Sequence, residues 1–193
     1  MTSQLLEDIT QKTKKGQHKL RVINYLLVHQ TATMNEIAKE LYVSVPTAAK
    51  ILQELQDAGS IELQGKLEIG IGRFPVLFGL SPRGGYFIGV DVKRSYLNIG
   101  LIDLQGHISH EDYGIPYSLE NTPEALEVIC QEIQLFIERH ALCQEEILNI
   151  NINIPGRINP VTGYSYNLFN FFPDRPLSQT ISERIGMRVS IDN

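Results

Sequence analysis

The sequence predicts an α/β chain of two domains: a small helical domain that ends in a β-hairpin, and a larger domain with the element order βββαβαβ. Apolar residues recur at helical spacing early in the chain, and after Pro82-Arg83-Gly84-Gly85 they alternate as in strands. The net charge changes at the same place. Residues 1–83 hold 10 Lys and Arg against 8 Asp and Glu, whereas residues 84–193 hold 7 against 14. We therefore expect domains at 1–82 and 85–193, with different partners.

The composition is ordinary for a globular protein, because 42% of the 193 residues are hydrophobic and 20% are charged. An uninterrupted apolar run of about 18 residues is absent, so no transmembrane helix is expected. The N-terminal sequence lacks the apolar core of a secretory signal. Cys130 and Cys143 have neither zinc-site spacing nor a CxxC motif, so we interpret both as packing residues in a reducing cytoplasm.

The first predicted helix runs from about His18 to Gln30. Its apolar residues have helical spacing and are Leu20, Ile23, Leu26 and Leu27. A basic run that contains no acid overlaps its start and consists of Lys12, Lys14, Lys15, Lys19 and Arg21. Such a run suits a segment that faces phosphates, and it suits a solvated tail equally well.

Two further helices carry clear start signals. Thr33 followed by Glu36 predicts a capping box, and the helix that it opens has an apolar face made of Ile37, Ala38 and Leu41. Ser44 predicts the N-cap of the next helix, whose first turn tolerates Pro46 and which ends at Gly59. Its buried face is expected to be Ile51, Leu52 and Leu55. Three helices with a tight turn between the second and third predict a helix-turn-helix.

A helix-turn-helix presents the start of its last helix to the major groove of DNA. The candidate contacts there are Ser44, Val45, Thr47, Ala48 and Lys50. Lys50 can donate to guanine or to phosphate, and Thr47 can bond a phosphate or touch a thymine methyl. Small helical units of this kind also serve as protein-interaction modules, in which case Lys50 is a solvated surface lysine.

A hairpin is predicted after the helices, where segments 61–63 and 67–71 bracket Gln64-Gly65-Lys66, and 76–80 supplies another strand. This is the wing of a winged helix-turn-helix. Lys66 and Arg73 are the candidate DNA contacts of the wing, because an arginine on an extended segment can enter a narrow minor groove.

The second domain is predicted from alternating patterns and turn residues. Its strands are expected at 86–91, 96–103, 107–113, 147–154 and 188–191, with helices from Thr122-Pro123 and over 177–185. The first of these helices is expected to bury Val128, Ile129, Ile133, Phe136 and Ile137. Gln105-Gly106 predicts a tight turn, and Gly186 closes the last helix.

Four stretches together resemble the ROK family, which is named for repressors, open reading frames and kinases. They are NEIAKELYVSVPTAAKILQELQDAGSI, GRFP, GVDVKRSYLNIGLIDLQG, and NIPGRINPVTGYSYNLFNF with RIGMRVSIDN. The resemblance implies that the second domain is one lobe of the ribonuclease H-like fold shared by actin and sugar kinases, the actin-like ATPase fold.

The phosphate-binding turn departs from the kinase pattern. Kinases of this family carry Asp-x-Gly-x-Thr, where the glycine lets backbone amides approach phosphate. Here the positions read Asp91, Lys93 and Ser95. We predict a degenerate turn that binds no nucleotide, unless Lys93 swings out and pairs with the phosphate.

The end of the chain also bears on kinase activity. Asp192 and Asn193 match the start of the family's catalytic segment, and the catalytic aspartate is expected to lie beyond them. The second lobe and the family's zinc ligands are also missing from the sequence. We predict no catalytic residue and no cofactor, and we expect a truncated fragment in preference to a naturally short relative.

The resemblance implies carbohydrate contacts at Gly156, Asn167 and Asn193. Asn167 is equally well explained as a loop-capping residue. The dense group of possible metal ligands, His107, His110, Glu111 and Asp112, fits an exposed edge strand, so no metal site is predicted. Asp91 and Asp103 leave nuclease-like chemistry as a minor option.

The leading hypothesis is a cytoplasmic, sugar-responsive transcriptional regulator, with repression favoured. Its expected partners are double-stranded DNA, a carbohydrate effector and further copies of itself in a homodimer or higher homo-oligomer, with no membrane contact. Two alternatives stay open: a sugar kinase with a DNA-binding head, and a dimerisation scaffold without a ligand.

Overall fold

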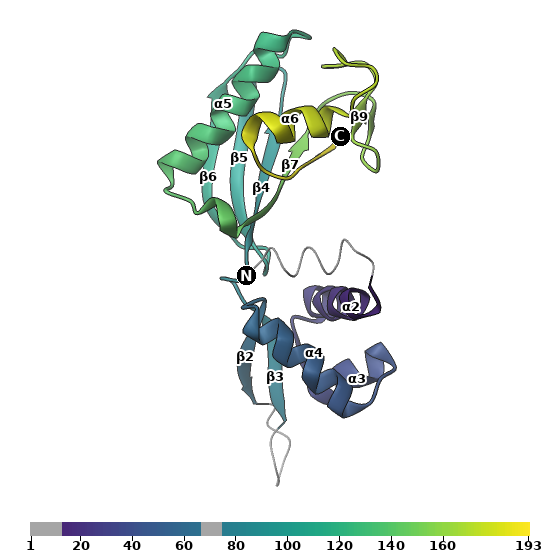
Figure 1. Ribbon diagram of the computed structural model, residues 1–193. Coiled ribbons are helices and arrows are strands. Elements are labelled where there is room, and N and C mark those ends of the chain that lie inside the picture. The colour runs from purple at the N-terminus through teal and green to yellow at the C-terminus, as the bar shows by residue number, and fades with distance from the viewer. Residues whose placement is uncertain (1–12, 67–74) are drawn as a thin grey trace. The chain divides into compact units, whose positions relative to one another are not determined.

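The computed structural model describes residues 13–66 and 75–193 (Figure 1). The chain divides into two compact units. The first is residues 1–85 with 103–106, and the second is residues 86–102 with 107–193. Among the described residues, no helix is long and apolar enough to cross a membrane.

Helix α2 (Lys14–His29) starts earlier than predicted, because Thr13 caps it. The Thr13 hydroxyl accepts a hydrogen bond from the amide of Gly16 at 2.9 Å. The predicted apolar face was partly wrong, since Leu20 and Leu27 are exposed. The buried face is Gly16, Lys19, Val22 and Leu26. Compared with the predicted face, the buried face is rotated toward Lys19. The ammonium group of Lys19 pairs with the carboxylate of Glu54 in the third helix of the unit.

Helices α3 (Met34–Leu41) and α4 (Val45–Asp57) follow the predictions from their caps. The Thr33 amide donates to Glu36 Oε2 at 2.7 Å and the Glu36 amide donates back to Thr33 Oγ1 at 3.3 Å, which confirms the capping box. Ser44 caps α4, and Pro46 lies in its first turn. The predicted buried residues of both helices are buried, namely Ile37, Ala38, Leu41, Ile51, Leu52 and Leu55.

A three-stranded sheet accompanies the helices, in the order β1 (Thr31–Thr33), β3 (Val76–Leu80), β2 (Ile61–Lys66). The predicted turn at Gln64-Gly65-Lys66 is wrong, because β2 continues to Lys66, which pairs with Val76. Gly65 has φ +101°, and the register shifts beside it, so the glycine marks a bulge within the strand. The predicted strand at 67–71 lies outside the described residues.

The second unit has a five-stranded sheet in the order β10, β7, β4, β5, β6. The strands are β4 (Tyr86–Val92), β5 (Tyr96–Asp103), β6 (Ile108–Pro116), β7 (Ile147–Asn153) and β10 (Val189–Asp192). β7 is parallel to both β4 and β10, and β5 is antiparallel to β6. Asn153 lies opposite Asp91 on one side and Asp192 on the other.

The predicted order βββαβαβ is confirmed for the main elements. Two short paired strands, β8 (Ile158–Asn159) and β9 (Tyr164–Ser165), and a 3-10 helix, Gln144–Glu146, were not predicted. They are two or three residues long, so they carry too few residues for a periodic pattern.

Helices α5 (Pro123–Arg139) and α6 (Leu177–Ile185) cover one face of this sheet (Figure 1). Thr122 caps α5 by accepting from the amide of Ala125 at 3.2 Å, and Gly186 ends α6 at φ +76°. The prediction for Val128 was wrong, since it is exposed. Residues that are buried between the helices and the sheet include Ile88, Val90, Leu97, Ile99, Leu126, Ile133, Phe136, Ile150, Ile152 and Ile181.

The two cysteines differ. Cys130 is buried in α5, and burial raises the pKa of its thiol to about 11, so it is a packing residue as predicted. The interpretation was wrong for Cys143, which is exposed just before the 3-10 helix. Its thiol donates a hydrogen bond to Glu145 Oε2, with the sulfur 3.1 Å from that oxygen.

Candidate functional site

The start of α4 forms an exposed polar surface. Ser44, Val45, Thr47 and Lys50 are all exposed. The Ser44 hydroxyl accepts from the Thr47 amide at 3.3 Å and lies 2.8 Å from the Thr47 hydroxyl. The start of a helix carries unsatisfied amides and the positive end of the helix dipole, so this surface favours anionic groups such as phosphates.

Ala48 was wrongly predicted to be exposed. Its relative exposure is 0%, and its amide bonds to the carbonyl of Ser44 at 3.0 Å. It lies on the same helix face as Ile51 and Leu52, which are three and four residues further on and are also buried. Ala48 is therefore a packing residue of the helix-turn-helix.

Lys50 in α4 and Lys66 at the end of β2 are exposed. Within the part of the chain that the structure describes, neither lysine forms an ion pair. Both ammonium groups therefore remain available to a polyanion. Arg73, the other predicted wing contact, lies outside the described residues.

Three cations of the basic run instead join helices within the unit. Lys15 Nζ lies 2.9 Å from Glu54 Oε1, Lys19 Nζ lies 3.3 Å from Glu54 Oε2, and Arg21 Nη2 lies 3.2 Å from Glu40 Oε1. Burial raises the pKa of Glu54, but hydrogen bonds from both lysines outweigh it and hold that pKa below its ordinary value. These pairs fasten α2 to α4 and α3.

The predicted phosphate turn is occupied by its own side chains. Lys93 Nζ lies 2.9 Å from Asp91 Oδ1, and the Asn153 amide donates to the same oxygen at 3.4 Å. The hydrogen bond and the charge of Asp91 raise the pKa of Lys93. The Lys93 amide donates to the carbonyl of Tyr96 at 2.9 Å, and Ser95 is exposed on the same turn. The lysine thus neutralises the aspartate that the turn carries.

A cavity of about 330 Å³ lies beside Asp91, on the sheet face opposite the helices. Its polar wall includes Asn98, Asn151 and Asn153, and Gly89 and Gly100 are also among its lining residues. The prediction from sequence did not include this wall. The signal was present, because residues 149–154 read NININI, and in a strand this alternation puts the three asparagines on one face and the isoleucines on the other.

The three predicted sugar contacts come together. The Asn193 amide donates to the carbonyl of Gly156, and Asn167 Oδ1 accepts from the backbone amide of Arg157 at 2.7 Å. Gly156 has φ +138°, and a Cβ atom there would lie 2.7 Å from Asn167 Oδ1. Asn167 therefore caps the loop, as the alternative interpretation held, and it does so beside Gly156 and Asn193.

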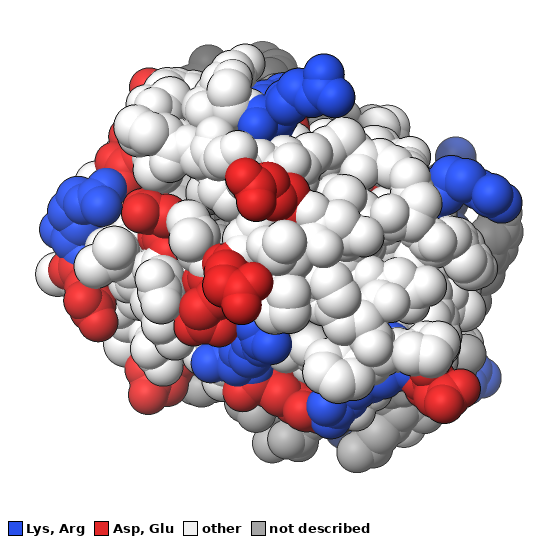
Figure 2. All heavy atoms as spheres, turned by 90° about the horizontal axis from the view of Figure 1, so that it is seen from above, with Lys and Arg blue, Asp and Glu red and all other residues white. Residues whose placement is uncertain are grey.

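The histidine and carboxylate group on β6 packs against α5. Asp112 binds the guanidinium of Arg139 and lies 3.3 Å from His140 Nε2, and the His110 ring lies 4.7 Å from the His140 ring. Figure 2 shows acidic and basic side chains around a broad uncharged area on the face seen from above, so that face has no single-sign patch.

The fold and these sites define a class of protein, a helix-turn-helix unit joined to one α/β lobe. The sequence model of the MarR family matches residues 16–65. The sequence model of the ROK family matches residues 87–193, which is more than half of the chain. The chain belongs to the ROK family.

Individual relatives agree with this assignment. The chain is 25% identical over 177 residues to the xylose repressor of Caldicellulosiruptor bescii, which covers 91% of this chain and 44% of the relative. It is 24% identical over 189 residues to the xylose repressor of Bacillus subtilis, which covers 96% of this chain and 48% of the relative. The chain thus spans less than half the length of these repressors.

A solved structure shows the same fold. It is described as a ROK family transcriptional regulator and homolog of the E. coli MLC protein. The TM-score is 0.64 at 22% sequence identity, and the match covers 84% of this chain and 41% of that one.

Proposed function

We propose that this chain is the DNA-binding unit and first α/β lobe of a cytoplasmic, sugar-responsive transcriptional repressor. The observation that carries the proposal is the exposed start of α4. Ser44, Thr47 and Lys50 are exposed there, whereas Lys15 and Lys19 of the same unit pair with Glu54 near the other end of α4. The names of the xylose repressors support the same function.

The proposed partners are double-stranded DNA, a carbohydrate and a second copy of the chain. A helix-turn-helix dimer reads two half-sites about one helical turn apart. A sugar can release such a dimer only if it binds one arrangement of the two DNA-binding units more tightly than the other. The loop around Gly156, Asn167 and Asn193 supplies amide donors and acceptors of the kind that bind sugar hydroxyls.

Phosphoryl transfer is less compatible with the second unit. Kinase turns hold phosphate on bare backbone amides, whereas the side chain of Lys93 lies against Asp91 in this turn. We therefore propose binding, without ATP turnover, as the role of this lobe.

The test is DNA binding by the wild-type chain and two lysine variants. Duplexes that bind are first selected from a randomised library, and affinity is then measured by fluorescence anisotropy at several salt concentrations. We expect Lys50→Gln to weaken binding of the selected duplex by at least about fivefold, as loss of a lysine contact to guanine or phosphate does.

Lys14→Gln is the matched control, because it removes the same charge from the same unit. The next residue in α2, Lys15, pairs with Glu54 in the C-terminal half of α4. Lys14 therefore lies near the end of α4 that is remote from Ser44. Equal losses in the two variants, or no selected duplex at all, contradict the proposal.

A further inference from the structure

Tyr42 is the most exposed large hydrophobic side chain among the described residues of the first unit. It lies in the turn between α3 and α4 with a relative exposure of 90%. An exposed aromatic ring gains no stability from burial. Exposed aromatic side chains with a polar tip are more typical of binding surfaces than of solvated turns.

The backbone conformation at this position is unfavourable for any residue with a Cβ atom. Tyr42 has φ 55° and ψ 45°, the left-handed conformation, and it ends α3. Its amide bonds to the carbonyl of Lys39 at 3.2 Å, and the next amide bonds to the carbonyl of Ala38 at 3.0 Å. Glycine adopts this conformation without strain and is the usual residue at such helix ends. The tyrosine therefore occupies a position that glycine would fill with less backbone strain.

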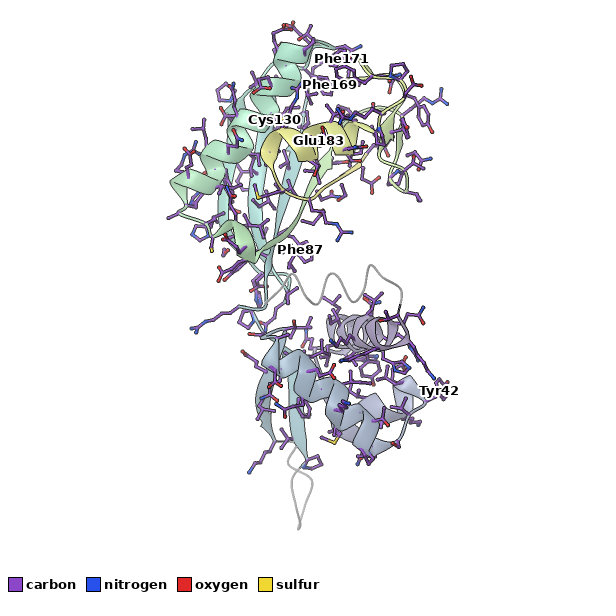
Figure 3. The ribbon with its side chains drawn as sticks, viewed as in Figure 1. Tyr42, Phe87, Cys130, Phe169, Phe171 and Glu183 are labelled. Atoms are coloured by element: carbon purple, nitrogen blue, oxygen red, sulfur yellow. The ribbon has the colours of Figure 1, made fainter. Side chains whose placement is uncertain are left out.

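Tyr42 also lies beside the exposed start of α4. It precedes the N-cap Ser44 by two residues, and the guanidinium carbon of Arg21 lies 5.9 Å from the centre of its ring. Figure 3 shows Tyr42 at the outer margin of the unit, projecting away from it. A phenol that carries a hydroxyl donor thus lies beside the surface that favours anions, and the Arg21 guanidinium, which pairs with Glu40, lies against its ring.

We propose that Tyr42 donates its phenolic O–H to a backbone phosphate oxygen of double-stranded DNA, at the edge of the groove that α4 enters. The inference rests on the proposed function and deepens it. Tyrosine hydroxyls are among the donors that bind phosphates, and contacts of this kind orient a protein on the duplex without reading bases. Such a contact stabilises complexes with any sequence to a similar extent.

The experiment uses the 193-residue chain with Tyr42→Phe and Tyr42→Gly, on a selected duplex and on a scrambled duplex. Tyr42→Phe is expected to weaken both complexes about 3- to 10-fold, the size of one hydrogen bond. The dependence of affinity on salt should keep its slope, because no charge is removed. Tyr113→Phe, at another exposed tyrosine, is the control and should change nothing.

Tyr42→Gly separates binding from folding. It should raise the melting temperature by relieving the left-handed backbone, and it should weaken DNA binding at least as much as Tyr42→Phe does. A more stable glycine variant with unchanged affinity overturns the inference. So does a loss restricted to the selected duplex, which indicates a base contact, or wild-type affinity in Tyr42→Phe. If the wild-type chain binds neither duplex, the proposed function fails as well.

Discussion

Thr47 and Ala48 are adjacent residues with opposite environments, because successive side chains on an α-helix point about 100° apart. Thr47 is exposed and Ala48 is fully buried. The sequence contained enough information to separate them, since Ala48 precedes the apolar residues Ile51 and Leu52 by three and four positions. Ala48 was included among the candidate contacts because it lies at the start of the last helix, and the helical period should have taken precedence over that position.

Ala48→Leu should therefore destabilise the first unit. The added atoms enter an enclosed space, and overpacking of this kind costs about 1–3 kcal/mol. Urea unfolding monitored by circular dichroism measures the change. Val45→Leu also enlarges an apolar side chain, at a position that is 44% exposed, and should change stability by less than about 0.5 kcal/mol. Equal stability of both variants would show that Ala48 is not enclosed.

Gly156→Ala should disrupt the candidate sugar loop. A Cβ atom at this position meets Asn167 Oδ1 at 2.7 Å, and the backbone has φ +138°. Gly106→Ala is the control, because φ there is +86° and nothing lies within 4 Å of the added atom. Calorimetry with a panel of sugars should detect weaker binding in Gly156→Ala alone. The expected loss is about tenfold or more, which corresponds to the loss of one polar contact. Binding of no sugar by the wild-type chain favours the scaffold alternative.

Among the elements, local signals predicted helix starts well. Thr33, Ser44 and Thr122 all cap the helices that they were expected to cap. A cap is a local arrangement within about three residues, so the sequence specifies it directly. The wing was harder to predict. Gly65 looked like the centre of a hairpin, yet it lies in a bulge, because pairing with β3 decides where β2 ends.

The attachment of α2 should depend on pH. The pKa of Glu54 is lowered in the folded state, so its contribution to stability is present above the pKa of the unfolded chain, about 4.3. That contribution is lost as the pH falls through the lower pKa of the folded state. Glu54→Gln should cost about 1 kcal/mol at pH 7, and the difference from wild type should shrink below about pH 4.

Urea unfolding at pH 7 and pH 3.5 tests this pH dependence. Asp57→Asn, at an exposed carboxylate near the end of the same helix, is the matched control and should show a much smaller difference at either pH. A constant difference between wild type and Glu54→Gln across this range would contradict the role of the two lysine pairs.

For the whole molecule, the order of elements and the family could be predicted from patterns distributed along the chain. The contacts between distant segments could not. Glu54 and Lys15, which lie on different helices, become partners only after folding, and an isolated basic run does not reveal its counter-ions. The turn at Asp91 was predicted to be degenerate because of its lysine, whereas the ion pair of Lys93 with Asp91 was not predicted, because the sequence does not specify the direction of an exposed lysine side chain.

The register of β7 places the Asp91 turn and the candidate sugar loop at the same edge of the sheet. Asn153 is paired with Asp91 in one neighbouring strand and with Asp192 in the other, and the loop that contains Gly156 starts immediately afterwards. The carboxyl ends of three parallel strands are thereby aligned in a single row. Slippage of this strand by one position would turn its isoleucines outward and its asparagines inward. The same slip would move the Asp91 turn, the Gly156 loop and Asn193 out of alignment together. A molecule that contacts all three would therefore bind only when the sheet has this register.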